Sequence, residues 1–169
     1  IKPKTGNFPI IFIPRVANSI AGHIASAING SSIARGTSFL KDYMNHSIFS
    51  KELNVIDDPF LKKGMGSRLF DAEGIGSKKV GLISNGILNN WLLDLSSSKQ
   101  LKMKTNANAV RGLNSPPTPG VSNFMIMPSK LTQNDLINDI DEGFLITELI
   151  GSSVSLITGD YSRGASGFW

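Results

Sequence analysis

The sequence predicts an α+β domain that is rich in antiparallel strands and contains a few short helices. Short runs of β-branched and aromatic residues recur in the second half, Asn85-Gly86 separates two of them, and one early segment repeats apolar residues every four positions. An Asn-Gly pair favours a type I′ turn, because both central residues of that turn need positive φ. The length of 169 residues, 40% of them apolar and 18% charged, is typical of one globular domain.

The first elements are predicted to be a strand and a helix. Residues 10–13 are β-branched or aromatic and end at Pro14, which indicates a short buried strand. Apolar residues then recur at helical spacing and predict one packed helix face, formed by Val16, Ile20, Ile24 and Ile28. Gly30 stands where a helix C-terminus favours glycine. Residues 31–66 follow no steady period and are expected to be mostly loop.

The middle of the chain predicts an antiparallel meander of three strands, at residues 69–73, 80–84 and 87–95. Ser96 is expected to cap a short helix that runs to about Met103. Residues 105–121 contain three prolines and no clear period, which indicates a long loop.

The last third of the chain is predicted to return to strands after one more helix. Residues 123–127 read as a strand, and Thr132 with Asp135 forms a capping box for a helix through Ile140. Three further strands are expected at residues 144–150, 154–158 and 161–169.

Composition excludes some classes of protein. The chain has no cysteine, which excludes disulfides and thiolate metal sites within it. The longest apolar stretch, residues 8–28, is interrupted by prolines and polar residues and falls short of the roughly 18–20 apolar residues of a membrane span. No signal peptide is recognised at the start. We therefore expect no membrane association and a cytoplasmic location.

The net charge of +4 is unevenly distributed. No acidic residue lies between Asp94 and Asp135, and this gap contains Lys99, Lys102, Lys104, Arg111 and Lys130. Such a stretch is either a solvated basic face or a surface for phosphates or an acidic partner.

Neither histidine has the neighbours that a metal site needs. His23 lies on the predicted helix, with no His, Asp or Glu three to five residues away and no acidic residue before Asp42. It is expected to be a packed core histidine, and His46 an exposed loop residue. The spacing Gly-x-Ser-x-Gly of a nucleophile elbow and the Walker spacing of a phosphate loop are also missing around Ser166 and Ser77.

Three carboxylates remain as candidates for chemistry. Asp71 and Glu73 are two residues apart and would share one face of a strand, although their position beside Gly74 favours turn formation and solvation instead. Glu148 interrupts an apolar strand, where a charge is costly unless it is paired, and Arg163 is its expected partner. This pair is either structural or lines a peptide-binding cleft.

The run from Ile157 to Trp169 resembles the signature of the TldE (PmbA) branch of the TldD/PmbA metallopeptidase family. Three other stretches agree with the family in order and spacing: residues 16–23, 67–74 and 147–151. The resemblance covers residues 10–169 and identifies the chain as similar to the carboxy-terminal domain of that family. It implies one domain over residues 1–169 that is incomplete, with a separate amino-terminal domain before it and final strands after it.

In this family, TldD subunits hold zinc on a His-Glu-x-x-x-His helix, and TldE subunits lack those ligands. The resemblance therefore implies no catalytic residue and no metal on this chain, with zinc on a TldD-like partner in a cytoplasmic heterodimer. The substrates would be unfolded or small peptides. An exposed strand edge could hold such a peptide, and the expected cleft or interface residues are Thr147, Glu148, Gly151, Asp160, Tyr161, Arg163 and Gly164.

Two other functions stay open. The acid-poor stretch, together with the family's older description as a modulator of DNA gyrase, allows a DNA- or gyrase-associated binding protein, although nucleic acid is not the expected partner. An autonomous hydrolase that uses Asp71, Glu73 or Glu148 is the second alternative.

Overall fold

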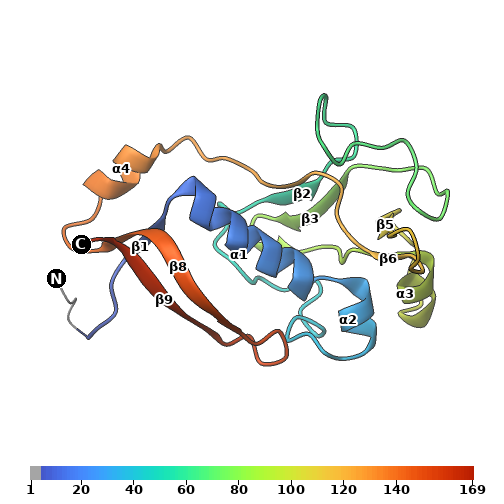
Figure 1. The fold of residues 1–169 in the computed structure, drawn as a ribbon, viewed down its shortest axis with the longest axis horizontal. Coiled ribbons are helices and arrows are strands. Elements are labelled where there is room, and N and C mark those ends of the chain that lie inside the picture. Colours follow the sequence, from blue (N-terminus) through green and yellow to red (C-terminus); the bar gives the residue numbers. More distant parts are fainter. Residues whose placement is uncertain (1–4) are drawn as a thin grey trace.

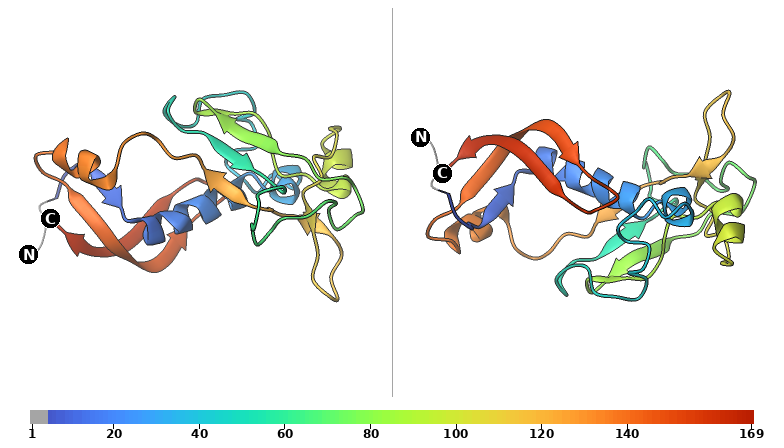
Figure 2. Two further views of the ribbon diagram at one scale, coloured as in Figure 1. Left: turned by 90° about the horizontal axis from the view of Figure 1, so that it is seen from above. Right: turned by 90° about the horizontal axis from the view of Figure 1, so that it is seen from below.

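Helix α1 lies between two sheets in this computed structural model, which describes residues 5–169 (Figure 1). α1 spans Pro14–Ala27 and contacts β8 (Phe144–Val154) in one sheet and β7 (Phe124–Ile126) in the other. The views from above and below show the long β8–β9 hairpin on one side of the helix and the second sheet on the other (Figure 2). α1 therefore packs against both sheets.

The first sheet has the strand order β1-β8-β9. β1 (Ile10–Phe12) pairs in parallel with the start of β8, and β9 (Tyr161–Phe168) pairs antiparallel with the whole of β8. β9 lies at the edge of this sheet. The strand predicted at 144–150 is confirmed as part of β8, which continues through Gly151 to Val154 with a shift of register. The strand predicted at 154–158 is wrong beyond Val154, because residues 155–159 form the turn to β9, in which Gly159 N donates to Ser155 O.

The second sheet is antiparallel, in the order β4-β3-β2-β7. Its strands are β2 (Val55–Asp57), β3 (Val80–Ser84), β4 (Ile87–Leu88) and β7. The predicted turn between β3 and β4 is confirmed, since Asn85 and Gly86 have φ of 50° and 76°. The strand predicted at 123–127 is confirmed as β7.

The predicted meander is only partly correct. The neighbour of β3 is β2, from the segment expected to be loop, and not residues 69–73. Residues 69–73 do not form a strand because the buried Asp71 carboxylate accepts hydrogen bonds from the backbone N–H groups of Glu73, Ile75 and Ala109, which turns the chain. Residues 89–95 leave the sheet because the N–H groups of Asn89 and Asn90 both donate to Leu82 O.

Helix α2 (Gly30–Ala34) is a second element in the region expected to be loop. Gly30 begins this helix, so its predicted place at the end of α1 is wrong. A Cβ atom at Gly30 would lie 2.6 Å from Leu92 O and 2.7 Å from Ser97 Oγ. The glycine therefore allows α2 to pack closely against α3 (Leu95–Gln100).

Helix α3 begins two residues earlier than predicted and ends at Gln100 instead of about Met103. Its cap is Asp94, not Ser96, and Asp94 and Ser97 form a reciprocal capping box. The long loop expected at 105–121 contains a small hairpin of β5 (Ala109–Val110) and β6 (Thr118–Pro119). This segment is held in place by buried polar side chains, because Asn106 bonds to the backbone of Trp91 and Leu93.

Helix α4 (Gln133–Asn138) has the predicted capping box of Thr132 and Asp135, and ends two residues before Ile140. None of its residues is buried. The main core lies between the C-terminal half of α1 and the second sheet, and its fully buried large side chains are Ile28, Val55, Leu82, Ile83, Leu88, Leu92 and Leu93. The predicted packed face of α1 is confirmed by the burial of Val16, Ile24 and Ile28. Within residues 5–169 we find no helix with the length and apolar character needed to cross a membrane.

Candidate functional site

The β8–β9 hairpin carries all the residues that were expected to form a cleft. Figure 1 shows it as a long two-stranded arm beside α1. β9 is largely exposed, and only Arg163 of its eight residues is half-buried. An exposed edge strand offers unpaired backbone N–H and C=O groups to an extended chain. The hairpin is therefore a candidate site for binding an extended peptide chain.

A groove of about 250 Å³ lies between the start of α1 and this hairpin. Its lining combines two cations, one carboxylate and a hydroxyl among apolar atoms: Arg15, Val16, Ser19, Glu148, Leu149 and Arg163. Arg15 Nη2 donates a hydrogen bond to Thr147 O at 3.1 Å and ties the helix to the strand. The groove thus has a fixed wall on each side.

Glu148 and Arg163 both line the groove, but the ion pair predicted between them is not present among the ion pairs of residues 5–169. The reason is that Glu148 is exposed, so its charge stays hydrated and needs no partner. Arg163 is half-buried, and its buried Nε has no hydrogen-bond partner in the described structure. A buried N–H without an acceptor is unusual in a folded protein, and Arg163 as a residue also lines the groove.

Two glycines and a threonine shape the strands behind this groove. Gly151 has a φ of 78° and lies where the register of β8 shifts against β9. Gly164 is paired with Ile150, and a Cβ there would lie 3.3 Å from Ile150 Cβ. Thr147 Oγ1 donates to Ser166 O at 3.2 Å. These residues set the backbone conformation of the hairpin, and none of them is among the residues that line the groove.

Asp160 and Tyr161 lie at the other end of the hairpin, at its turn. Asp160 Oδ2 accepts a hydrogen bond of 2.6 Å from Thr158 Oγ1, and its carbonyl accepts one from Ser155 N. The Tyr161 ring meets the His23 ring edge-to-face, with 5.9 Å between centroids. Of the expected cleft residues, Glu148 and Arg163 therefore line the groove at α1, Tyr161 lines a second hollow under the turn, and Asp160 lines a shallower hollow beside it.

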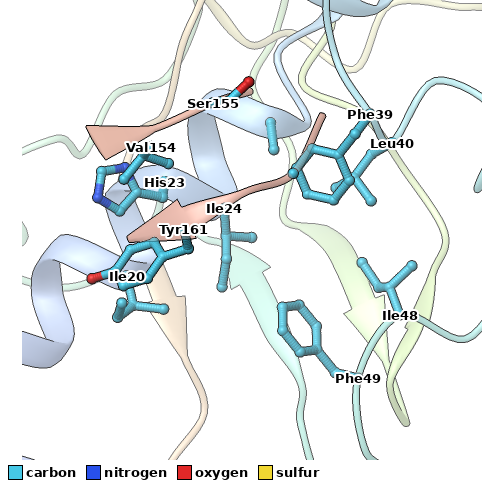
Figure 3. Close-up of a pocket in the computed structure, with 12 residues that line it drawn as sticks. Ile20, His23, Ile24, Phe39, Leu40, Ile48, Phe49, Val154, Ser155 and Tyr161 are labelled. Atoms are coloured by element: carbon cyan, nitrogen blue, oxygen red, sulfur yellow. The ribbon is translucent and has the colours of Figure 1, made fainter. Parts of the chain in front are cut away.

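His23 is at the wall of that second hollow, not fully inside the core. Figure 3 shows it beside Val154 and Tyr161, with Phe39 and Leu40 on the opposite side. The residue is half-buried, and its Nε2 is buried without a hydrogen-bond partner in the described residues. The prediction of a packed core histidine is thus correct only in part. His46 is exposed, as predicted.

The residues around His23 are the wrong kind to hold a metal. A His-Glu-x-x-x-His motif that began at His23 would need Glu at position 24 and His at position 28. The chain has Ile24 and Ile28 there, and both are buried in the apolar core. Within residues 5–169 no group of three or more metal-binding side chains converges.

Asp71 and Glu73 do not form a carboxylate pair for catalysis. Asp71 is 3% exposed and accepts three backbone hydrogen bonds within its own turn and from Ala109. Glu73 Oε2 accepts a hydrogen bond of 2.8 Å from Leu95 N, at the first turn of α3. Each carboxylate is thus used to hold a loop, as the turn interpretation predicted.

Sequence reasoning missed Arg15 and Ser19 as site residues. Their place opposite Glu148 depends on a contact between segments more than 120 residues apart. The available signal was Arg15 itself, a cation in the first turn of α1, three residues after the end of β1.

The model of the PmbA/TldA metallopeptidase C-terminal domain matches residues 5–169. A helix between two mostly antiparallel sheets, closed on one side by the β8–β9 hairpin, is thus the fold of a metallopeptidase-family domain. The chain belongs to this PmbA/TldD family, as the resemblance implied.

Two relatives and two solved structures illustrate the match. The chain is 37% identical to Metalloprotease PmbA of Escherichia coli O157:H7 over 168 residues, which covers 99% of this chain and 35% of the relative. It is 34% identical to a Metalloprotease PmbA homolog of Buchnera aphidicola, over 99% of this chain and 36% of the relative. The TldE structure from Thermococcus kodakarensis has a TM-score of 0.74 at 27% identity, over 86% of this chain and 33% of that one.

A structure from Bacteroides thetaiotaomicron, named as a candidate modulator of DNA gyrase, has a TM-score of 0.87 at 27% identity. It covers 99% of this chain and 36% of that one. The chain therefore spans about a third of the length of these relatives. It corresponds to one portion of a larger protein in each of them.

Proposed function

We propose that this chain is the carboxy-terminal domain of a TldE/PmbA-type subunit that holds no metal itself and completes the peptide cleft of a TldD-like partner. The observation that supports this most directly is the pair Ile24 and Ile28, apolar and buried where a zinc helix beginning at His23 would need Glu and His. The partner would hold zinc, which activates water for peptide hydrolysis. The complex is cytoplasmic in this proposal.

The hairpin supports a role in holding the substrate. β9 is an edge strand, so an extended peptide can add to it through backbone hydrogen bonds whatever its sequence. Only unfolded segments or small peptides present a free extended backbone. Arg15 and Arg163 in the neighbouring groove add two cations against the single carboxylate of Glu148, which suits a peptide carboxylate or carbonyl.

The test is co-purification followed by an activity assay. The full-length protein is isolated from its native cytoplasm together with whatever binds it, and peptide hydrolysis is measured for the complex and for each subunit, with and without a chelator. We expect hydrolysis only by the complex and its loss with chelator. Hydrolysis by this subunit alone that survives chelation would instead support an autonomous hydrolase.

A second candidate function is DNA- or gyrase-associated binding. Its support is the exposed lysines on and after α3, Lys99, Lys102 and Lys104, together with the printed name of the Bacteroides relative. Binding through lysine and phosphate contacts weakens steeply with salt. A DNA titration at low and high salt with the full-length protein tests it, and no association at low salt would end this candidate.

A further inference from the structure

The loop that follows β2 exposes large apolar side chains and positive charge together. Within residues 59–70, which we call the basic loop, Met65 is fully exposed. Four more large apolar side chains are between 39% and 78% exposed: Phe60, Leu61, Leu69 and Phe70. The loop contains three cations, Lys62, Lys63 and Arg68, and no acidic residue. Exposed apolar groups gathered in this way are typical of a surface that meets a partner.

The basic loop is held in one conformation by its neighbours. The Asn123 side chain accepts a hydrogen bond from Gly66 N and donates one to Ser67 Oγ, both at 3.0 Å. Ser67 Oγ in turn donates to Leu61 O at 2.6 Å. A Cβ atom at Gly66 would lie 2.2 Å from Ser122 O, so the loop packs closely on that segment. The exposed side chains therefore stand on a preorganised surface, which lowers the entropic cost of binding a partner.

Helix α4 presents a surface of the opposite charge. None of its residues is buried. A hollow of about 520 Å³ lies along it, lined by two leucines, two aspartates and an asparagine: Leu131, Asp135, Leu136, Asn138 and Asp139. Residues 131–142 also contain Asp141 and Glu142, and no cation. Among the ion pairs of residues 5–169, none uses these carboxylates or the cations of the basic loop.

The two surfaces complement each other in charge and in apolar character. Met65 has an unbranched side chain that adapts to irregular apolar surfaces, which suits the hollow between Leu131 and Leu136. Lys62 and Lys63 would then meet the carboxylates at its rim. Within one copy the surfaces are apart, since Figure 1 shows α4 and the loop after β2 on the same upper side of the molecule but well separated along its length. A second copy of the chain can bring them together.

We propose that two copies of this chain pair through these surfaces, with α4 of each copy on the basic loop of the other. Because both surfaces lie on one side of the molecule, a twofold axis between them forms both contacts at once, and every interaction is made twice. The pairing uses neither zinc nor a TldD-like subunit. It therefore holds or fails independently of the proposed function.

The first test is the oligomeric state of the full-length protein, purified without a TldD-like subunit and followed by sedimentation velocity over a range of concentrations. We expect a dimer whose Kd rises with salt, because salt screens exposed charges. Met65→Ser should raise this Kd about tenfold or more, since the buried side chain is lost from both contacts. Leu113→Ser is the matched control, because Leu113 is 98% exposed on the β5–β6 hairpin, and it should leave the Kd unchanged.

A charge exchange tests the pairing of the two surfaces. One variant carries Lys62→Glu and Lys63→Glu, and the other carries Asp139→Lys and Asp141→Lys. Each variant alone places like charges opposite each other in both contacts, and its Kd should rise at least about tenfold. An equimolar mixture should dimerise again, because the new glutamates meet the new lysines in one contact and the natural residues meet in the other.

The possible results separate clearly. All four exchanged side chains are exposed, and recovery in the mixture requires both variants to be folded. A dimer that both charge variants leave unchanged, or a mixture that does not recover, would overturn the inference. A chain that is monomeric alone would also overturn it, even if the same residues then bound a TldD-like subunit. Partner-dependent peptide hydrolysis is unaffected by any of these results.

Discussion

Asn108 Nδ2 donates a hydrogen bond of 2.7 Å to Asp57 Oδ2, and both residues are almost completely buried. The same carboxylate accepts hydrogen bonds from Ser122 N and Ser122 Oγ, each at 2.8 Å. One side chain at the end of β2 thus joins two segments that lie 51 and 65 residues further along the chain. This connection holds the 105–121 segment against the second sheet.

Replacing this carboxylate should be costly. Asp57→Ala leaves the donors of Asn108 and Ser122 buried without an acceptor, and we expect a loss of about 2–4 kcal/mol in the free energy of unfolding. Asp141→Ala is the matched control, because Asp141 is exposed, and it should change stability by less than about 0.5 kcal/mol. Denaturant unfolding measures both. Equal stability of the two variants would show that the network contributes little.

The β3–β4 turn provides a second comparison. Gly86 has a φ of 76°, and a Cβ there would lie 2.2 Å from Phe49 O. Gly86→Ala should therefore destabilise the protein by about 2 kcal/mol or more. Gly81→Ala, on the neighbouring strand, meets nothing closer than 3.6 Å and should be neutral or slightly stabilising. Thermal unfolding measures both variants. Similar melting temperatures would contradict the predicted difference between Gly86→Ala and Gly81→Ala.

The elements that the sequence predicted correctly are those with a local signal. The period of α1, the Asn85-Gly86 turn and the Thr132 capping box depend on residues within a few positions of each other. The elements that were missed depend on distant partners. β2 is a three-residue strand without a pattern of its own, and it is defined by pairing with β3 and β7.

The candidate site shows the same division. The sequence located the hairpin residues, but it expected Glu148 to be buried and paired with Arg163, since an apolar run surrounds it. In the fold, Glu148 is exposed. The face of a strand that meets solvent is decided by what packs against it, here α1, and the sequence of β8 alone does not contain that information.

The capping box of α4 predicts a pH effect. Hydrogen bonds from the backbone N–H of Thr132, and then from its hydroxyl, lower the pKa of Asp135 below its ordinary value of 3.8. A lowered folded-state pKa favours folding above the unfolded-state value. The contribution of Asp135 is therefore present above about pH 4 and is lost as the pH falls through the folded-state pKa.

NMR titration of the Asp135 carboxyl measures this directly. We expect a midpoint below 3.8, and Thr132→Ala should raise it part of the way, because the backbone donor remains. A wild-type midpoint at or above the ordinary value would show that the capping box is not formed in solution.

The groove predicts an effect on substrate binding. Arg163→Met keeps an unbranched apolar stem and removes the guanidinium, so it should raise KM for partner-dependent peptide hydrolysis by about tenfold, as the loss of one hydrogen bond to a charged group would. Arg111→Met is the control, since Arg111 is exposed on the β5–β6 hairpin. Steady-state kinetics of the reconstituted complex separates KM from kcat. If both variants had the same KM, Arg163 would not contribute to substrate binding.

The central claim is that this subunit contributes a cleft and no zinc. It is tested most directly by elemental analysis of the full-length protein, purified without its partner, dialysed and never exposed to chelator. The account predicts no stoichiometric zinc, because Ile24 and Ile28 occupy the positions that ligands would need beside His23. One tightly held zinc ion per chain would contradict it.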